Sequence, residues 1–369
     1  MRVLVAGGGS GGHLYPALAI LEGFRARGAE RLGCIGARRE LEREVFADYP
    51  WLETFLIHGR GLPRRPSWRW PLALGELALG LMESLLIISR FRPTVIIGTG
   101  GFASFPPLFW GILLKIPTVA CEVNVVPGLV SRWLAPRVGL ALVAYPETAL
   151  LLRAKRIAVT GLPLRPGLLE VARLPREELK ADLGLDPRKR TVLVLGGSRG
   201  AAPLNRAIMN SESDRDGLQI LLVTGRRAAG RGEGARRRGI IVREYLDRYE
   251  MGEALGAADL VISRAGAATL ALRTALGRPA LLVPWPGAAQ DHQEKNARFL
   301  KRAGGALVLH EDLLEEIDLV ELTKEFLAER ERLQRMAAAS RAVGRRDGLR
   351  RVIEEVERYL ANSQQRNGQ

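Results

Sequence analysis

Three glycine-rich turns contain the residues of this sequence that are best suited to bind a ligand. They read GGGSGGH at residues 7–13, GTGGFAS at residues 98–104 and GGSRGA at residues 196–201. Glycine lets a backbone come close to a ligand, and the free amides at the start of a following helix attract an anion. We therefore expect phosphate-type binding at these turns, and the imidazole of His13 beside them is a candidate general base.

The first turn also fits the spacing of a dinucleotide-binding loop through Gly7, Gly9 and Gly12. Many doubly wound proteins use such turns only to pack a helix on a strand, so this match alone does not identify a nicotinamide enzyme. The next apolar run ends in GARR at residues 36–39, without the acidic residue that would bind the ribose of NAD. A second such turn at Gly196 is better explained by two domains that face a cleft, and we expect no cofactor.

Short apolar runs that alternate with helical stretches position these turns. The runs cover residues 2–6, 31–35, 94–97, 118–121, 191–195, 220–223, 260–263 and 280–284. This alternation is typical of βαβ units with parallel sheets, in which ligands bind at the carboxyl ends of the strands. The sequence predicts two doubly wound α/β domains that join near residue 162.

Composition limits the class and the compartment of the protein. Of 369 residues, 47% are hydrophobic and 26% are charged, which suits two globular domains. Two cysteines cannot form a disulfide framework, and residues 2–6 are too short for a signal-peptide core, so we expect a reducing, cytoplasmic location. The formal net charge of +15 favours polyanions, but no nucleic-acid-binding module accompanies it, and we expect no nucleic-acid partner.

Taken in order, the motifs resemble the MurG family of glycosyltransferases from residue 1 to about residue 302. Besides the three turns, the matching segments are EVNVVPGLVSRWLA from Glu122, VTGLPLR ending at Arg165, SRAGAATLA from Ser263 and DHQEKNA from Asp291. The resemblance implies the GT-B architecture, with two doubly wound Rossmann-like domains facing a central cleft.

The same resemblance divides the chain by role. Residues 1–161, with a C-terminal helix at about residues 346–361 that returns to them, are expected to bind the acceptor and the membrane. Residues 162–345 are expected to bind the UDP-sugar. Residues 362–369 are polar, and we expect them to be a disordered tail.

An inverting, metal-independent hexosyltransferase is the activity that the resemblance implies. It would move N-acetylglucosamine from UDP-N-acetylglucosamine to the 4-hydroxyl of a lipid-linked N-acetylmuramyl-pentapeptide, which converts lipid I to lipid II in peptidoglycan synthesis. Amides, helix ends and basic side chains carry the diphosphate charge in place of a metal. Asp214 and Asp216 look like a metal-binding pair, but they lie in a polar connecting stretch that we expect to be solvated loop.

Six residues are assigned by the resemblance to the donor diphosphate, three of them at a helix start. They are Arg165, Gly197, Ser198, Ala267, Ala268 and Thr269. Leu246 is expected to bind the uracil through its backbone, and Gln293, with Asp291 and His292 beside it, the sugar hydroxyls. Leu272 stands where the family has a glutamate that holds the ribose hydroxyls, so the sequence predicts weak donor binding.

Four residues are assigned to the acceptor side of the cleft, namely Ser10, Gly11, Gly12 and Asn124. An inverting transfer needs a base that takes the proton of the acceptor hydroxyl. His13 is the first candidate, although it could instead brace its loop. Glu122 is the alternative base, unless it only orients the Asn124 loop.

Three further positions depart from the family pattern. Val123 replaces the glutamine of Glu-Gln-Asn, Leu162 replaces the asparagine of Asn-Pro, and Arg199 replaces the glutamine after Gly-Gly-Ser. These changes concern details of the acceptor side more than the class of reaction.

Residues 60–92 combine six arginines and two tryptophans with an apolar run at residues 72–88. At about 100° per residue, one helical stripe faces a core. It contains Leu74, Leu77, Ala78, Leu81, Leu85 and Ile88, and a neighbouring face contains Leu72, Leu79, Met82 and Leu86. Because Glu76, Glu83 and the short length disfavour a transmembrane span, we expect a helix lying on an anionic membrane surface, and a peripheral protein at the cytoplasmic face of the cell membrane.

Two other activities fit the same architecture. A UDP-sugar epimerase would need similar phosphate contacts but neither a membrane face nor an acceptor loop. A glycolipid glycosyltransferase would use a glyceride acceptor. Product analysis with UDP-N-acetylglucosamine alone separates the epimerase, because it makes a new UDP-sugar without any acceptor.

Overall fold

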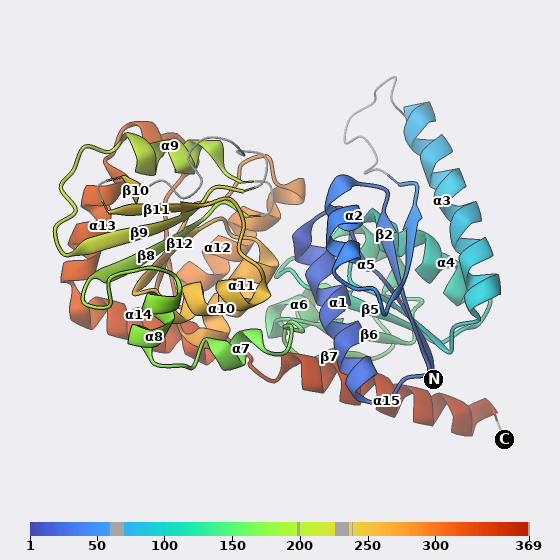
Figure 1. Cartoon of the computed structure of the whole chain (residues 1–369). Helices are drawn as coiled ribbons and strands as arrows, with labels where there is room; N and C mark the ends of the chain where they lie inside the picture. The colour runs from blue at the N-terminus through green and yellow to red at the C-terminus, as the bar shows by residue number, and fades with distance from the viewer. Residues whose placement is uncertain (60–69, 198–199, 226–235, 238, 368–369) are drawn as a thin grey trace. The chain divides into compact units, whose positions relative to one another are not determined.

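The computed structural model describes residues 1–59, 70–197, 200–225, 236–237 and 239–367. The chain forms two compact units (Figure 1). The first comprises Met1–Arg165 and Asp347–Gln369, and the second comprises Pro166–Arg346.

The first unit contains a sheet of seven parallel strands in the order β3-β2-β1-β4-β5-β6-β7. The strands are β1 (Arg2–Ala6), β2 (Arg31–Ala37), β3 (Glu53–Ile57), β4 (Val95–Gly98), β5 (Thr118–Glu122), β6 (Leu140–Val143) and β7 (Ile157–Val159). The central strands are apolar at successive positions, as expected of a parallel sheet covered on both faces.

Helices cover both faces of this sheet, because alternate strand residues point to opposite sides. On one side, Val3 and Val5 pack with α1 (Gly11–Ala26), α2 (Glu40–Ala47) and α15 (Gly348–Asn367). On the other side, Leu4 and Ala6 pack with α3 (Trp70–Phe91), α4 (Phe105–Leu113) and α5 (Leu129–Leu134). The short elements η1 (Phe102–Ser104) and α6 (Pro146–Leu151) complete the unit.

The docking of α3 differs from the predicted core stripe. Its buried residues are Ala73, Gly80, Ser84, Ile88 and Phe91, so that Ile88 is the one stripe residue that is fully buried, while Leu74 and Ala78 are exposed. A Cβ on Gly80 would lie 2.2 Å from the His58 carbonyl oxygen, so glycine lets the helix approach the end of β3 closely. Small residues at this contact, in place of leucines, explain the rotated face.

The predicted disordered tail is wrong over residues 362–367, because α15 extends to Asn367. No glycine or proline interrupts the sequence before Gly368. A helix that is already nucleated gains one hydrogen bond for each residue added, so polar residues can extend it. The Ser363 hydroxyl also donates to the Tyr359 carbonyl at 2.8 Å.

The second unit contains a seven-stranded sheet in the order β10-β11-β9-β8-β12-β13-β14, parallel except for β10. Its strands are β8 (Arg190–Leu195), β9 (Leu218–Val223), β10 (Arg236–Arg237), β11 (Ile240–Arg243), β12 (Leu260–Ser263), β13 (Ala280–Leu282) and β14 (Leu307–Val308). Its helices are α7 (Leu168–Val171), α8 (Arg176–Asp182), α9 (Ala202–Asn210), α10 (Arg248–Ala257), α11 (Ala267–Leu276), α12 (His292–Arg302), α13 (Leu319–Ala328) and α14 (Arg330–Val343), with the 3-10 turns η3 (Ala289–Asp291) and η4 (Glu311–Glu315). The predicted α/β architecture of two doubly wound units is thus confirmed.

Candidate functional site

Both sheets reverse their strand order where the predicted ligand loops lie. In the first sheet the reversal falls between β1 and β4. In the second sheet it falls between β8 and β12, which Figure 1 labels. Doubly wound sheets bind ligands outside the carboxyl ends of the strands at such a switch point. The turns that begin at Gly7, Thr99, Gly196 and Arg264 follow these four strands.

His13, in the first turn of α1, is held by the turn after β4. Its Nδ1 lies 2.9 Å from the Thr99 carbonyl oxygen. A carbonyl can only accept, so Nδ1 carries the proton, and Nε2 of the neutral ring keeps a free electron pair. The Thr99 hydroxyl donates in turn to the His13 carbonyl at 2.7 Å. The ring is therefore fixed in the tautomer that a general base at Nε2 requires.

The second glycine turn packs against this histidine. Gly100 and Gly101 have φ values of 99° and 74°, a region that favours glycine. A Cβ on Gly100 would lie 2.7 Å from the His13 Nδ1, and one on Gly101 would lie 2.2 Å from the Gly8 carbonyl oxygen. The role visible for this turn is thus to support the first turn and its histidine.

The start of α1 is open to an anion. The N-cap residue Ser10 is exposed, its side chain makes no capping hydrogen bond, and the first turn contains no acidic residue. The first amides of a helix lack partners within the helix, so the N–H groups of Gly11 and Gly12 can serve a negatively charged ligand.

Glu122, the alternative base, is buried at the end of β5 with both carboxylate oxygens engaged. Oε1 accepts from the Asn124 backbone N–H at 2.9 Å, and Oε2 accepts from the Gly128 N–H at 2.9 Å. The Thr148 hydroxyl donates to the Asn124 carbonyl from the other side at 3.1 Å. This arrangement favours a role for Glu122 in orienting the Asn124 loop over a role as a base.

Arg165, expected at the donor diphosphate, ends the first unit. Its Nη1 lies 3.5 Å from the Tyr49 hydroxyl oxygen, and its Cζ lies 4.8 Å from the centre of the Tyr15 ring. Burial raises the pKa of Tyr49, so its hydroxyl stays neutral. Sequence reasoning did not single out these two tyrosines, which fix the guanidinium in this structure.

In the second unit, the turns after β8 and β12 lie side by side. The Arg264 N–H donates to the Leu195 carbonyl at 3.2 Å, which joins the two turns at their base. Gly197 has a φ of 82° and open space where a Cβ would be. Ser198, predicted beside it, and the departing residue Arg199 lie outside the described residues.

The N-terminus of α11 has the character expected of a diphosphate site. Gly266 is its N-cap, no side chain caps it, and Ala267, Ala268 and Thr269 form a first turn without an acidic residue. Ala268 and Thr269 are half-buried. Leu272, four residues after Ala268, lies on the same side of the helix and is also half-buried.

Leu246 precedes α10 and has a buried side chain. The next residue, Asp247, starts the helix with a capping box, in which its carboxylate accepts from the Glu250 N–H and the Glu250 carboxylate accepts from the Asp247 N–H. Because core packing and capping fix this segment, the backbone of Leu246 is the part left to contact a base.

Gln293 lies at the start of α12, after a strained turn. Its Oε1 accepts from the Trp285 N–H at 3.0 Å, which leaves the Nε2 amide as a donor. Gln290 and Asp291 have φ values of 54° and 53°, a left-handed conformation that costs on the order of 1 kcal/mol for each residue. Strain of this kind concentrates at binding sites, which fits the predicted sugar contact.

Arg264 is a third residue that sequence reasoning did not single out. It is buried, and its Nη1 donates to the carbonyls of Val283 and Pro284 at 3.1 and 3.4 Å. Its Nη2 pairs with Glu311. The arginine thus holds the turn after β12 against the segment that leads to Trp285 and Gln293.

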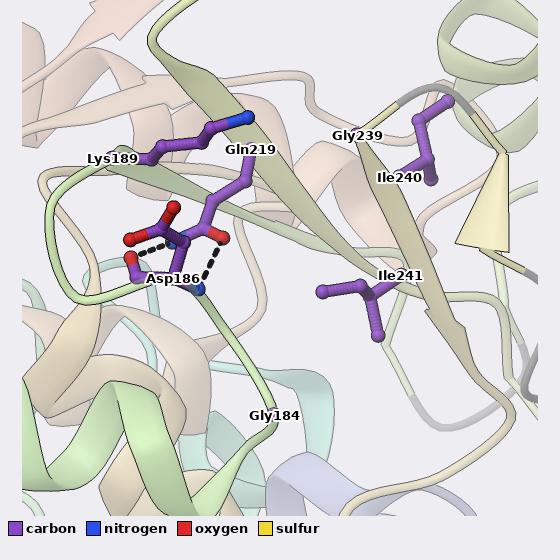
Figure 2. A pocket seen from close by; sticks show the side chains of 7 residues that line it. All are labelled: Gly184, Asp186, Lys189, Gln219, Gly239, Ile240 and Ile241. Carbon is purple, nitrogen blue, oxygen red and sulfur yellow. Dashed lines mark hydrogen bonds between the residues drawn. The ribbon is translucent and has the colours of Figure 1, made fainter.

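A cavity of about 180 Å³ lies near the amino ends of strands β8, β9 and β11, at the end of the second sheet opposite the predicted ligand turns (Figure 2). The Gln219 side chain is already bound by the backbone of Asp186: the Asp186 N–H donates to the Gln219 Oε1 at 2.9 Å, and the Gln219 Nε2 donates to the Asp186 carbonyl at 2.8 Å. Among the described residues no cluster of three potential metal ligands occurs, and Asp214 and Asp216 are exposed. The predicted site residues lie elsewhere.

Comparison with known proteins agrees with the division of the chain into two units. Residues 3–142 match the glycosyltransferase family 28 N-terminal domain, and residues 191–352 match the glycosyltransferase family 28 C-terminal domain. Among solved structures, a crystal structure of Acinetobacter baumannii MurG has a TM-score of 0.69 at 22% identity and covers 97% of this chain and 99% of its own. The UDP-GlcNAc 2-epimerase of Neisseria meningitidis bound to UDP-GlcNAc has a TM-score of 0.65 at 11% identity and covers 97% and 100%. At these identities the likeness concerns the fold alone.

Relatives found by sequence have higher identities to this chain than these solved structures. A protein of Moorella thermoacetica is 38% identical over 96% of this chain and 98% of its own length, and one of Desulfitobacterium hafniense is 36% identical over the same shares. Both carry the name UDP-N-acetylglucosamine–N-acetylmuramyl-(pentapeptide) pyrophosphoryl-undecaprenol N-acetylglucosamine transferase. The chain therefore belongs to glycosyltransferase family 28 and, within it, to the MurG family.

Proposed function

We propose that this protein transfers N-acetylglucosamine from UDP-N-acetylglucosamine to the 4-hydroxyl of a lipid-linked N-acetylmuramyl-pentapeptide. The observation that carries the proposal is the nearly full-length identity of 36–38% to relatives named for this reaction. The open helix starts at the switch points of both sheets support it, because each can bind one of two anionic substrates.

His13 is the proposed general base. The Thr99 carbonyl holds Nδ1, so Nε2 can take the proton of the acceptor hydroxyl as that oxygen attacks the anomeric carbon and the bond to UDP breaks. Attack from the face opposite UDP inverts the anomeric centre. Glu122 supports the reaction by holding Asn124, and the N–H groups of Gly11 and Gly12 receive negative charge of the acceptor.

The second unit is proposed to hold the donor. The first-turn amides of α11 at Ala267, Ala268 and Thr269, with Gly197 beside them, stabilise the charge that develops on the leaving UDP. Gln293 holds the sugar hydroxyls through its Nε2, and Leu246 the uracil through its backbone. Ser198 and Arg165 would add diphosphate contacts, and no metal is needed for this charge stabilisation.

The membrane contact is proposed at the α3 apolar face, which we define as Leu72, Leu79, Met82 and Leu86. These side chains are 47–64% exposed, a large apolar surface for a water-soluble fold. Phe109 and Leu113 on α4, the helix packed beside α3, are exposed as well. Arg90 and Arg92 at the end of α3 are exposed cations suited to anionic lipid, whereas the arginines of residues 60–69 lie outside the described residues.

A peripheral location at the cytoplasmic face fits α3 better than a transmembrane span. By length and composition α3 could cross a bilayer, alone among the helices of the described residues. However, Glu83 accepts hydrogen bonds from the His58 backbone N–H at 2.6 Å and from the Arg38 Nη2 at 3.0 Å. These contacts and the close approach at Gly80 attach α3 to the first sheet, so the helix would lie along the membrane with one face in lipid.

Labelled N-acetylglucosamine transfer tests the proposal. The purified protein should label a lipid-linked muramyl acceptor, leave a glyceride acceptor unlabelled, and produce no new UDP-sugar when the acceptor is omitted. Labelling of the glyceride would indicate a glycolipid glycosyltransferase, and a new UDP-sugar would indicate an epimerase; either result would overturn the proposed function.

A further inference from the structure

Glu42 on α2 is a buried carboxylate beneath the first glycine turn. Its side chain has no exposed surface, and Oε1 accepts a hydrogen bond from the Gly9 N–H at 2.5 Å. Oε2 is also buried, and no donor among the described residues lies within hydrogen-bond distance of it. The proposed mechanism makes no use of this residue.

A carboxylate in this setting is costly for the fold. Burial removes the hydration of a charged group, and the loss is recovered only when cations or several donors surround it. In the described part of the chain, Glu42 takes part in no ion pair. Arg39, three residues earlier, donates from Nη1 to the Gly9 carbonyl at 3.1 Å. Features that cost stability concentrate where function requires a particular geometry.

The carboxylate and Arg39 together determine how Gly9 is oriented. Gly9 has a φ of 85°, so its peptide groups can turn in directions that other residues disfavour. Glu42 takes the N–H of Gly9 and Arg39 takes the C=O, so both polar groups are held from α2. A Cβ on Gly8 would lie 2.8 Å from the Glu42 Oε1, so the turn rests directly on the carboxylate.

The orientation of Gly9 matters for the residues that follow it. Ser10 is the N-cap of α1, and Gly11, Gly12 and His13 form the first turn. With the Gly9 N–H drawn toward α2, the amides available to a ligand are those at the start of α1. The path of the turn also fixes the position of the His13 backbone.

We propose that Glu42 is a positioning residue for acceptor binding, which holds the Gly9 N–H so that the start of α1 and His13 face the lipid-linked acceptor. This inference rests on the proposed function. It makes Glu42 specific to acceptor use, because the donor residues other than Arg165, namely those assigned to the uracil, the diphosphate turns and the sugar, lie in the second unit.

Glu42→Met tests the proposal, since methionine has a similar length and is apolar but cannot accept from Gly9. We expect kcat/KM for the lipid-linked acceptor to fall about tenfold or more, the lower bound for losing a hydrogen bond to a charged group. The affinity for UDP, measured by calorimetry, should stay within twofold of wild type. The melting temperature should not fall, because a buried charge has been removed. Hydrogen exchange of the backbone amides at residues 7–14 should become faster.

Two further variants sharpen the test. Glu42→Gln keeps an oxygen that can accept from Gly9 and should recover most of the lost kcat/KM. Glu40→Gln, at the exposed start of the same helix, is the matched control and should behave as wild type.

An acceptor kcat/KM within twofold of wild type in Glu42→Met would overturn the inference. So would a parallel loss of UDP affinity and melting temperature, which would mark Glu42 as a purely structural residue. A wild-type protein without any transfer activity would instead refute the proposed function, so the two failures are distinguishable.

Discussion

Leu272→Glu is predicted to tighten donor binding. Leu272 is half-buried in α11 on the same side as Ala268, one turn beyond the helix start proposed for the diphosphate. The family has a glutamate here for the ribose hydroxyls, and between Asp259 and Asp291 this sequence has no acidic residue that could replace it. The substitution would restore a carboxylate where a ribose attached to that diphosphate is expected.

The size of the effect follows from the strength and the surroundings of the new contact. Hydrogen bonds to a charged group contribute roughly 1.5–3 kcal/mol, which corresponds to about a 10- to 100-fold tighter dissociation constant. Position 272 lies beyond the first turn, so the helix dipole adds little. Because the side chain is half-buried, desolvation of the carboxylate opposes the gain, and we expect about tenfold.

Calorimetric titration of UDP into wild type and Leu272→Glu measures this difference. UDP that lacks the 2′- and 3′-hydroxyls should show little or no gain, and Leu272→Gln should gain less because its hydrogen bonds carry no charge. A thermal melt checks folding, since half the burial of a leucine costs about 1 kcal/mol. Equal UDP affinities, or an equal gain without the ribose hydroxyls, would refute the placement of α11 at the ribose.

Three further predictions concern the base, the membrane face and the start of α15. His13→Ala should lower turnover about 100-fold or more while UDP affinity stays nearly normal, because proton transfer alone is lost; unchanged turnover in a steady-state assay would remove His13 from the mechanism. Replacing Leu79, Met82 and Leu86 by glutamine should weaken flotation with anionic vesicles but leave activity on a detergent-dispersed, short-chain acceptor; unfolding of this variant would mean that these residues belong to a core. Asp347→Asn should lower the free energy of unfolding by about 0.5–1 kcal/mol at pH 7, because the hydrogen bond and the charge of Arg351 lower the pKa of Asp347. A carboxylate whose pKa is lowered in the folded state stabilises the protein above its unfolded pKa of about 3.9, and this stabilisation is lost as the pH falls through the folded-state pKa. The denaturant curves of wild type and variant should therefore converge at about pH 2. A constant separation between the curves would contradict the assignment of the effect to the Asp347 charge.

Most strands that are buried on both faces were predictable, although the buried β6 (LALV) and the interior strand β11 were not among the predicted runs. Residues 191–195 (TVLVL) end in four apolar residues without alternation, and they form all of β8 except its first residue. Edge strands give weaker signals because they carry polar residues and few neighbours. For example, β3 contains the exposed Glu53 and Thr54, and β14 is only two residues long. Neither was predicted.

The candidate site was predictable as a set of turns but not as a set of contacts. Glycine spacing located the turns, and strand alternation located the edge of the sheet where they meet. The bond from His13 to Thr99 joins residues 86 apart, and the bond from Gly9 to Glu42 joins residues 33 apart. Such partners depend on the packing of whole helices on the sheet, which no local pattern encodes.

The hydrogen bond from Gly9 to Glu42 bears on the dinucleotide-binding interpretation of the first turn. Gly7, Gly9 and Gly12 fit that spacing, and the sequence argues against NAD because residues 36–39 contain no acidic residue. In a dinucleotide site, the second glycine lets the backbone approach the pyrophosphate. Here that glycine is Gly9, its N–H is occupied by Glu42, and a negative charge lies beneath it. A pyrophosphate at Gly9 would lose an amide donor and meet a carboxylate, so the spacing is satisfied while the chemistry it stands for is blocked.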